Sequence, residues 1–420
     1  MIITENAYLR ADGRKGIRNH IVVAYLVECA HHVAREIVYP YRERGVHLIG
    51  FGGCYPNDYA ARMMRVLCTH PNVGGVILLS LGCESFNRAS LREAIAASGR
   101  PVETLVIQQE GGTRKTIEEG RRLMESMLAA VAQVPRVPLR MDEFTVGTVC
   151  GGSDATSGIT ANPGIGRAFD RLVEQNAACI FEETGELIGC EDIMTARAAT
   201  PELAGILRAS VAKAARYYAV LGHGSFAPGN AEGGLTTIEE KSMGAYAKSG
   251  ASRISGLLKP GDTPPRGGLY LLDVVPDGEV RFGFPNINDN AEIAELIACG
   301  SHVILFSTGR GSVVGSAISP VIKVCANPET FRRMSEDMDV DAGRILEGRA
   351  SLDEVGLEIL DLSLSVAGGA PTCSEALGHQ DSDEHPEGHV IFQTRKGYKL
   401  KDRLLRPASV FVARKPGRKD

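Results

Sequence analysis

Three cysteines near the start of the chain each follow an apolar run. The runs are rich in β-branched residues, which predicts buried parallel strands. Because the carboxyl ends of parallel strands meet at one edge of a sheet, we expect the three thiols to lie together at that edge. Thiolates bind zinc, iron and iron–sulfur clusters, so the pattern predicts a metal site. The three residues are Cys29, Cys54 and Cys83.

Two other interpretations of these cysteines stay open. A cysteine after an apolar run is commonly a small buried residue without a further role. A disulfide between two of the three thiols is the other alternative. Cys150 and Cys190 follow apolar runs as well, so position after a strand does not by itself identify a ligand. The paired spacing of a zinc finger is absent from the sequence.

Two polar loops have the composition of anion sites. Residues 10–20, RADGRKGIRNH, combine four basic residues with two glycines just before the first strand. Residues 150–166, CGGSDATSGITANPGIG, offer backbone N–H groups and hydroxyls after another strand, and Asp154 adds a base or a metal ligand. An ordinary solvated turn or connecting loop is the alternative in both cases.

An acidic strand and two further loops complete the candidate residues. Residues 181–191, FEETGELIGCE, place carboxylates among apolar residues, where they need cations or a metal as partners. The loop at residues 222–244 carries His223, Lys241 and two threonines, and residues 307–323 carry an arginine and a lysine.

The order of elements predicts an α/β protein. From residue 20 to residue 134, apolar runs alternate with segments of helical periodicity, which is typical of βαβ units and a parallel sheet. Residues 134–144 contain two prolines without periodicity and mark a domain boundary. We predict a Rossmann-like parallel-sheet domain at residues 1–138 and a larger α/β catalytic domain at 139–381. A charged tail that is poorly ordered or peripheral is expected at 382–420.

The composition narrows the class of protein. With 420 residues and a formal net charge of −5, the chain is long enough for two domains and lacks the basic excess of a nucleic-acid binder. It contains no apolar run of membrane-spanning length and begins without an apolar signal core, so we expect no membrane partner and a cytoplasmic location. The positive charge of the basic tail is suited to binding an acidic partner.

At this point the motifs resemble a known family. DGRKGIRN, LGCE, CGGSDATSGITANP, EETGELIGCE, EGGLTTIEEKS and STGRGSVVGSAISPVIKVCANP occur in order along the chain and are similar to the altronate/galactarate dehydratase family. Other stretches, among them LGHGSFAPGNAEGGLTT and FGFPNINDNAEIAELIACG, resemble the members that act on sulfolactate more than those that act on sugar acids. The charged segment after LGHQD departs from the family pattern.

The resemblance implies a metal-dependent lyase, with ferrous iron or another divalent metal, or an iron–sulfur cluster. The implied reaction is β-elimination from a small anionic 2-hydroxy acid: (2R)-3-sulfolactate gives pyruvate and sulfite, or a sugar acid loses water. A non-catalytic subunit is the third possibility. The family's small N-terminal domain is missing here, so we expect a separate small subunit as partner, and an oligomer.

This reaction needs a metal, a base and cationic groups for the substrate. The three cysteines are the predicted metal ligands. The candidates for the base and other catalytic roles are His223, Lys241 and Asp154. The predicted substrate-binding residues are Arg18, Asn19, Ser153, Thr237, Arg310 and Lys323.

Overall fold

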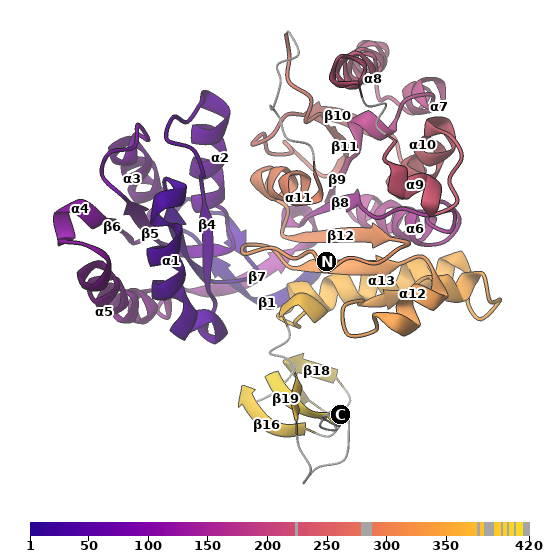
Figure 1. The fold of residues 1–420 in the computed structure, drawn as a ribbon. Coiled ribbons are helices and arrows are strands. Elements are labelled where there is room, and N and C mark those ends of the chain that lie inside the picture. Colours follow the sequence, from indigo (N-terminus) through magenta and orange to yellow (C-terminus); the bar gives the residue numbers. More distant parts are fainter. Residues whose placement is uncertain are drawn as a thin grey trace, which may run out of the picture.

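The computed structural model describes residues 1–222, 226–278 and 288–375, and short strands beyond them at 379–381, 390–395, 398–400, 403–406 and 409–414. Two α/β bodies lie side by side, and the last strands lie below them (Figure 1). The predicted α/β class, with an N-terminal parallel sheet and a larger C-terminal domain, is confirmed. No described helix is long and apolar enough to cross a membrane.

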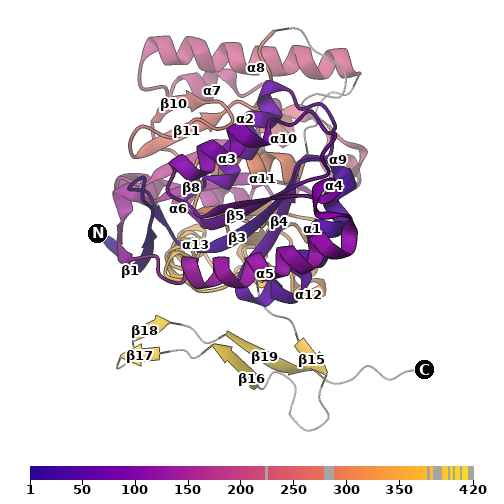
Figure 2. The ribbon, with the colours of Figure 1, turned by 90° about the vertical axis from the view of Figure 1, so that its left-hand side faces the viewer.

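The N-terminal sheet has four parallel strands in the order β4-β3-β5-β6. Its helices cover both faces, as Figure 2 shows. Residues of α1 and α5 pack on one face, and residues of α2 and α3 on the other. The elements are β3 (His20–Tyr25), α1 (His31–Val38), β4 (Val46–Gly50), α2 (Asp58–Cys68), β5 (Val73–Ser80), α3 (Arg88–Ala97), β6 (Val102–Val106), α4 (Ile107–Glu110) and α5 (Thr113–Val131).

The predicted boundary segment forms a strand. β7 (Arg136–Arg140) pairs antiparallel with β1 (Ile2–Leu9), whose other neighbour is β2 (Lys15–Gly16). β7 is an edge strand, which is where a sheet tolerates prolines such as Pro138. The chain therefore crosses between the domains as part of a small sheet.

The C-terminal sheet has seven strands in the order β10-β11-β9-β8-β12-β13-β14, and every adjacent pair is parallel. From β8 the chain builds one side of the sheet and then returns to place β12 on the other side of β8. The strand order thus reverses at β8 and β12. The strands are β8 (Thr145–Cys150), β9 (Ala178–Glu182), β10 (Ile254–Leu258), β11 (Gly268–Leu272), β12 (Val303–Thr308), β13 (Val321–Cys325) and β14 (Val340–Asp341).

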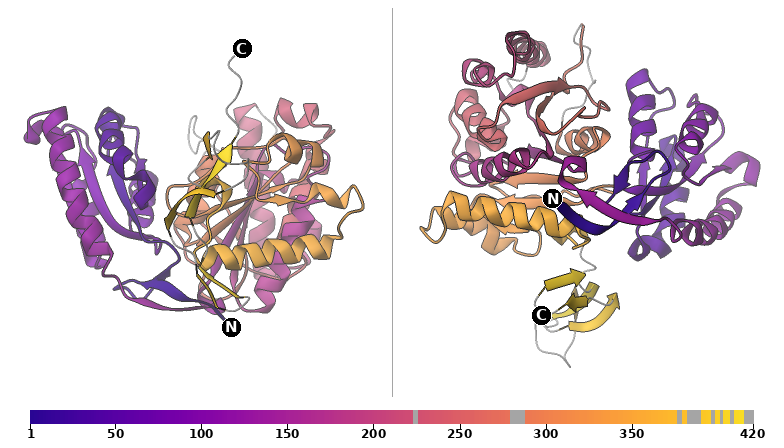
Figure 3. Two further views of the ribbon diagram at one scale, coloured as in Figure 1. Left: turned by 90° about the horizontal axis from the view of Figure 1, so that it is seen from below. Right: turned by 180° about the vertical axis from the view of Figure 1, so that it is seen from behind.

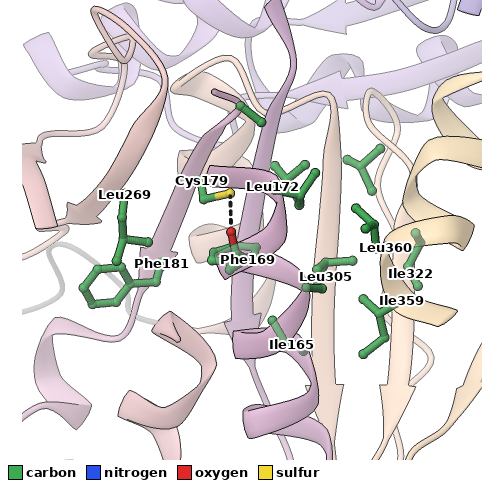
Figure 4. Packing of buried hydrophobic residues seen from close by; sticks show 14 of the residues in the cluster. Ile165, Phe169, Leu172, Cys179, Phe181, Leu269, Leu305, Ile322, Ile359 and Leu360 are labelled. Carbon is green, nitrogen blue, oxygen red and sulfur yellow. Dashed lines mark hydrogen bonds between the residues drawn. The ribbon is translucent and has the colours of Figure 1, made fainter. Parts of the chain in front are cut away.

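Helices α6 and α13 cover one face of this sheet. Phe169 and Leu172 of α6 lie in one core with Leu305 and Ile322 of the sheet and Ile359 of α13, as Figure 4 shows. Residues of α7, α8 and α10 belong to the same core, whereas α11 packs in the cluster on the other face. The helices of this domain are α6 (Ala161–Glu174), α7 (Glu191–Thr195), α8 (Pro201–Leu221), α9 (Pro228–Glu232), α10 (Ile238–Tyr246), α11 (Asp289–Ala298), α12 (Pro328–Arg333) and α13 (Leu352–Ala367).

The two domains share a continuous apolar core. One buried cluster contains Val76 and Leu78 of the N-terminal sheet together with Ile304 and Phe306 of the C-terminal sheet. Helix α11 contributes Leu296 and neighbouring residues to the same cluster, and α11 contacts α2. This shared burial fixes one domain against the other, because separating them would expose the cluster to water.

The C-terminal segment, for which the sequence predicted a poorly ordered or peripheral tail, contains short strands. They form a sheet in the order β15-β19-β16 and a two-stranded β17-β18 pair. The right-hand view in Figure 3 shows them below the two domains. The strands are β15 (His379–Asp381), β16 (Val390–Arg395), β17 (Tyr398–Leu400), β18 (Arg403–Arg406) and β19 (Ser409–Arg414).

Candidate active site

The reversal of strand order brings two glycine-rich loops together. Gly151 N donates to the carbonyl of Ser307 at 3.1 Å, and Arg310 N donates to the carbonyl of Gly152 at 2.8 Å. A side chain at Gly151 would collide with Asp289, since its Cβ would lie 2.1 Å from that carboxylate. Glycine is therefore required where the loop after β8 passes the start of α11. In parallel α/β sheets, ligands bind in the crevice at such a reversal.

A cavity of 400 Å³ lies at this place. Its walls come from the loop after β8, the segment after β9, and helices α8 to α11. The lining residues are Cys150, Gly151, Gly152, Ser153, Glu186, Tyr218, Phe226, Ala227, Pro228, Asn230, Lys241, Asn288, Asp289 and Glu292. A small polar substrate fits the size and the composition of this cavity.

Two buried ion pairs form the wall next to the sheet. Lys241 Nζ donates to Glu186, and Lys248 Nζ donates to Glu183. The Lys248 side chain is 0% exposed and that of Glu183 is 3% exposed. Glu183 also accepts the backbone N–H of Cys150, so it joins the ends of β9 and β8. Removal of either partner would leave an uncompensated buried charge.

Cys150 connects the two carboxylates. Its Sγ lies 3.6 Å from Glu186 Oε2 and receives a hydrogen bond from Ser153 Oγ at 3.5 Å. The thiol of Cys150 and the carboxylates of Glu183 and Glu186 place one ligand atom each within 4.8 Å of one another. Throughout the described part of the chain, no other set of three or more potential ligands is this compact. A thiolate with two carboxylates is a donor set for a single divalent transition metal.

The backbone of Glu183 is strained. Its φ of 151° is positive, which is unusual for a residue other than glycine. The surrounding structure holds it there through the contacts of its side chain with Lys248 and with the Cys150 backbone. Strain of this kind concentrates at functional sites, where it positions a side chain that chemistry needs.

Burial and charge set the protonation of the ion pairs. Burial raises the pKa of Glu186, Glu183 raises it further and Lys241 lowers it, which leaves the pKa at about 7. Burial also raises the pKa of Glu183, but Lys248 outweighs it and the pKa is lowered. Burial lowers the pKa of Lys241, but Glu186 and Cys150 outweigh it and the pKa is raised. Of these groups, Glu186 is the one whose pKa lies near neutral pH.

Three of the predicted residues lie at or beside the cavity. Ser153 and Lys241 line it. Asp154 lines an adjacent cavity of 290 Å³ that shares Ser153 and Lys241. Its carboxylate accepts hydrogen bonds from Thr156, Ser157 and Asn327, so it organises the loop after β8. His223 lies outside the described residues.

Three other predicted residues support the loops around the cavity. Arg310 donates to the carbonyl of Gly229 at 2.6 Å and to Glu232, which holds α9 against the loop after β12. Thr237 caps α10 by accepting the N–H of Glu240. Lys323 is 1% exposed and donates to the carbonyl of Val314 and to Ser374. None of these three lines the 400 Å³ cavity.

Arg18 and Asn19 lie at the opposite end of β3 from Cys29. Arg18 donates to both oxygens of Glu375, at 2.8 and 3.0 Å, and to two carbonyls of the α13 region. Asn19 accepts a hydrogen bond from Arg10. Both line a separate cavity of 660 Å³. The structure therefore does not bring them to the same site as Lys241, and Arg18 joins the N-terminal domain to the end of the C-terminal domain.

The three predicted metal ligands follow β3, β4 and β5, as expected. Backbone hydrogen bonds join the three loops, from Glu28 N to Gly52 O and from Ser85 N to Cys54 O. The cysteines are exposed. Their thiols are not a set within 4.8 Å. Thiolates on one ion lie within about 4.6 Å, twice the metal–sulfur distance, so this arrangement suits a single ion poorly. A cluster, whose cysteines bind different iron atoms, tolerates wider spacing.

The sequence patterns gave no catalytic or binding role to several residues of the site. The sequence marked Glu183 and Glu186 as carboxylates in need of a cation, but it gave them no catalytic role. No motif in the sequence points to Lys248, because it lies in a short turn after α10. Asp289 and Glu292 begin a helix that the sequence reasoning did not place near the cavity.

Comparison with known proteins identifies the family. The family described as D-galactarate/Altronate dehydratase, C-terminal, matches residues 141–386, and the family described as D-galactarate dehydratase/Altronate hydrolase, second domain, matches residues 7–132. The chain belongs to the D-galactarate/altronate dehydratase family. The cavity and its ion pairs lie entirely within the matched C-terminal region.

Individual relatives are lyases. The (2R)-sulfolactate sulfo-lyase subunit beta of Chromohalobacter salexigens is 35% identical over 89% of this chain and 95% of its own length. Altronate dehydratase of Escherichia coli is 29% identical over 88% of this chain and 74% of its own. Galactarate dehydratase (L-threo-forming) of Escherichia coli is 32% identical over 73% of this chain and 59% of its own.

The C-terminal segment has a different relationship. The family described as GrpE matches residues 370–414. Protein GrpE of Nitratidesulfovibrio vulgaris is 51% identical over 47 residues, which are 11% of this chain and 25% of its own. The chain thus combines a dehydratase-family region with a short GrpE-like segment, which accounts for the departure from the family pattern after LGHQD.

Removal of the GrpE-like strands should leave the lyase region intact. A chain ending at Gly378 keeps Ser374 and Glu375, which contact Lys323 and Arg18, but loses all the strands from β15 to β19. We expect the midpoint of thermal unfolding of the main transition to change by less than about 2 °C, because those strands pair among themselves. A chain ending at Thr372 is the matched control and should melt earlier. Equal melting of both truncated chains would contradict this account.

Proposed function

We propose that the chain is the large subunit of a lyase that eliminates sulfite from (2R)-3-sulfolactate to give pyruvate. The compact group of Cys150, Glu183, Glu186 and Lys241 at the strand-order reversal carries the proposal. The similarity to the sulfo-lyase subunit beta supports this substrate, because that similarity extends over 95% of the relative. A sugar-acid dehydratase is the second candidate, supported by the similarity to the altronate and galactarate enzymes.

The charge of the cavity supports a bound cation. Glu186, Asp289 and Glu292 line it together with Lys241. Among the described lining residues, the carboxylates of Glu186 and Asp289 offset the charge of Lys241, so a doubly charged anionic substrate would find no net positive charge there. A divalent metal held by Cys150 and Glu183, with Glu186 left free to accept a proton, would supply positive charge to the cavity and, when bound, would stabilise the negative charge that develops on the substrate carboxylate and C2.

Side chains of the cavity abstract the proton, bind the substrate and orient it. Glu186 accepts the C2 proton, since it lines the cavity and has a pKa of about 7, close to the working pH. Lys241 binds an anionic group of the substrate, because its pKa is raised and it remains charged. Ser153 and Asn230 supply neutral hydrogen bonds that orient the substrate. The C2–H electron pair then forms the C2=C3 bond, and the C3–S electron pair leaves with sulfite.

The substrate is tested by direct assay. The purified chain, reconstituted anaerobically with ferrous iron and a small partner subunit, should release sulfite and pyruvate in equal amounts from (2R)-3-sulfolactate. We infer the partner because the sulfo-lyase relative is named as a subunit beta. Altronate and galactarate serve as competing substrates. Turnover of a sugar acid without sulfite release from sulfolactate would exclude our first candidate and select the dehydratase.

Replacement of Glu186 tests the base. Glu186→Gln should lower kcat by at least about 100-fold, since general-base catalysis contributes that much or more. In the unmodified protein, kcat should rise with pH through about 7, because Glu186 must lose its proton before it accepts another. Glu191→Gln, an acid five residues further on at the start of α7, is the control. An unchanged pH profile in Glu186→Asp, which moves the carboxylate, would argue against this role.

Two cysteine variants separate the two possible metal sites. We propose that Cys29, Cys54 and Cys83 hold an iron–sulfur cluster and that Cys150 belongs to a site for a single divalent ion. Cys83→Ser should then lose the visible absorbance of a cluster and most bound iron. Cys150→Ser should keep that absorbance and weaken the binding of one added divalent ion, measured by calorimetry. Full iron content and full activity in Cys83→Ser would remove the three cysteines from the metal site.

A further inference from the structure

A row of buried acids leads away from the cavity along α11. Glu292 lies in the cavity wall beside Asp289 and Lys241. Glu295 follows three residues later, so the two carboxyl groups share one face of the helix. Glu292 is 8% exposed and Glu295 is 2% exposed. The row therefore runs from the reaction space into the interior between the domains.

Tyr59 of the N-terminal domain continues this row. Its hydroxyl donates a hydrogen bond to the carboxylate of Glu295. Tyr59 is only partly buried and lines another cavity, of 290 Å³, together with Arg62 of α2 and Lys259 of the C-terminal domain. Glu292, Glu295 and Tyr59 thus connect the reaction cavity with a partly exposed hydroxyl at the boundary between the domains.

Burial of the row raises the pKa values of its carboxyl groups. Lys241 and Lys248 form ion pairs with Glu186 and Glu183. Among the described residues, Glu292 and Glu295 form no ion pair with these lysines. Burial raises the pKa of Glu292 well above its usual value, and Glu183, Glu186, Asp289 and Glu295 raise it further. Burial raises the pKa of Glu295 to about 7, although the Tyr59 hydrogen bond lowers it.

Glu182 interacts with the row from the sheet side. It is 1% exposed, and its Oε2 has no hydrogen-bond partner among the described residues. It interacts electrostatically with Glu292 and Glu295, and burial raises its pKa well above the usual value. The other titratable groups at the row are Lys248, which interacts with Glu182, Cys299, which interacts with Glu295, and Lys241, which interacts with Asp289. Glu292 is therefore the buried acid of this row that lines the cavity, and burial favours its protonated form.

We propose that Glu292 protonates C3 of the enol that elimination produces, and that Glu295 and Tyr59 return the proton from the boundary between the domains. The inference rests on the proposed function. Elimination leaves enolpyruvate, whose conversion to pyruvate needs a proton at C3. In this step the O–H bond of Glu292 breaks and a C3–H bond forms with the electron pair of the C2=C3 bond. The enol hydroxyl loses its proton to water in the cavity, and C2 becomes a carbonyl.

The assignment separates two proton transfers in space. Glu186 lies after β9 and takes the proton from C2, whereas Glu292 lies on α11 and supplies one to C3. Substrate carrying deuterium at C2 should therefore give pyruvate without deuterium at C3. Transfer of the label from C2 to C3 within one turnover would show that a single group performs both steps and would overturn the proposal.

The timing of the two products tests Glu292 directly. In the unmodified protein, sulfite and pyruvate should appear together. In Glu292→Gln, which replaces the acid by a neutral group of the same shape, sulfite should appear first, and pyruvate should follow at the rate at which free enolpyruvate converts in water. Glu292→Asp should restore simultaneous release. Glu118→Gln, an exposed residue of α5, is the control. Simultaneous release in Glu292→Gln, or loss of sulfite release in a folded Glu292→Gln protein, would overturn the proposal.

A measurement without substrate separates this inference from the proposed function. At pH 7 the infrared spectrum should contain the C=O stretch of a protonated carboxylic acid that disappears in Glu292→Gln. In Tyr59→Phe the exchange of that proton with D₂O should slow by at least about tenfold. Absence of the band overturns the role of Glu292 whatever the substrate is, and unchanged exchange in Tyr59→Phe overturns the return path. Absence of sulfite release by the unmodified protein, with the band present, would overturn only the substrate.

Discussion

The burial of carboxylates at the reversal of strand order is the constraint on which the site depends. Glu183 and Glu186 lie at the end of β9, where an unpaired charge would be very costly, and Lys248 and Lys241 compensate them. Because Lys241 lies on α10 and Lys248 in the turn after it, both segments must lie over the carboxyl edge of the sheet. The same arrangement closes one wall of the cavity, so the stability of the edge and the chemistry of the site use the same contacts.

The apolar cluster between the domains gives α11 a second function. Its residues Ile293 and Leu296 are part of the shared core, whereas Glu292 and Glu295 belong to the acid row. Because both domains pack against this helix, Tyr59 of the N-terminal domain reaches Glu295 and donates a hydrogen bond to it. The N-terminal domain thus contributes an edge with three exposed thiols and a hydroxyl that reaches an acid of the C-terminal domain.

The two cysteine sites differ in their physical character. Cys150 is buried, and burial raises its pKa well above the usual value, so it needs a metal or a nearby cation to become a thiolate. Cys29, Cys54 and Cys83 are exposed and follow adjacent strands. The first environment suits one ion in contact with substrate. The second suits a larger inorganic group bound at the surface of the sheet.

The sequence by itself determined the α/β class, the strands and helices from β3 to α5, and the position of the three cysteines after parallel strands. These features follow from local patterns, namely apolar runs, helical periodicity and the common direction of parallel strands. The family also followed from motifs, because they are long and ordered. It did not determine which polar residues share a site. Arg18 and Lys241 both looked suitable for an anionic substrate, yet Arg18 joins Glu375 and Lys241 joins Glu186. Only the tertiary structure decided this, since strand order and the packing of α10 and α11 bring residues together that no local pattern relates.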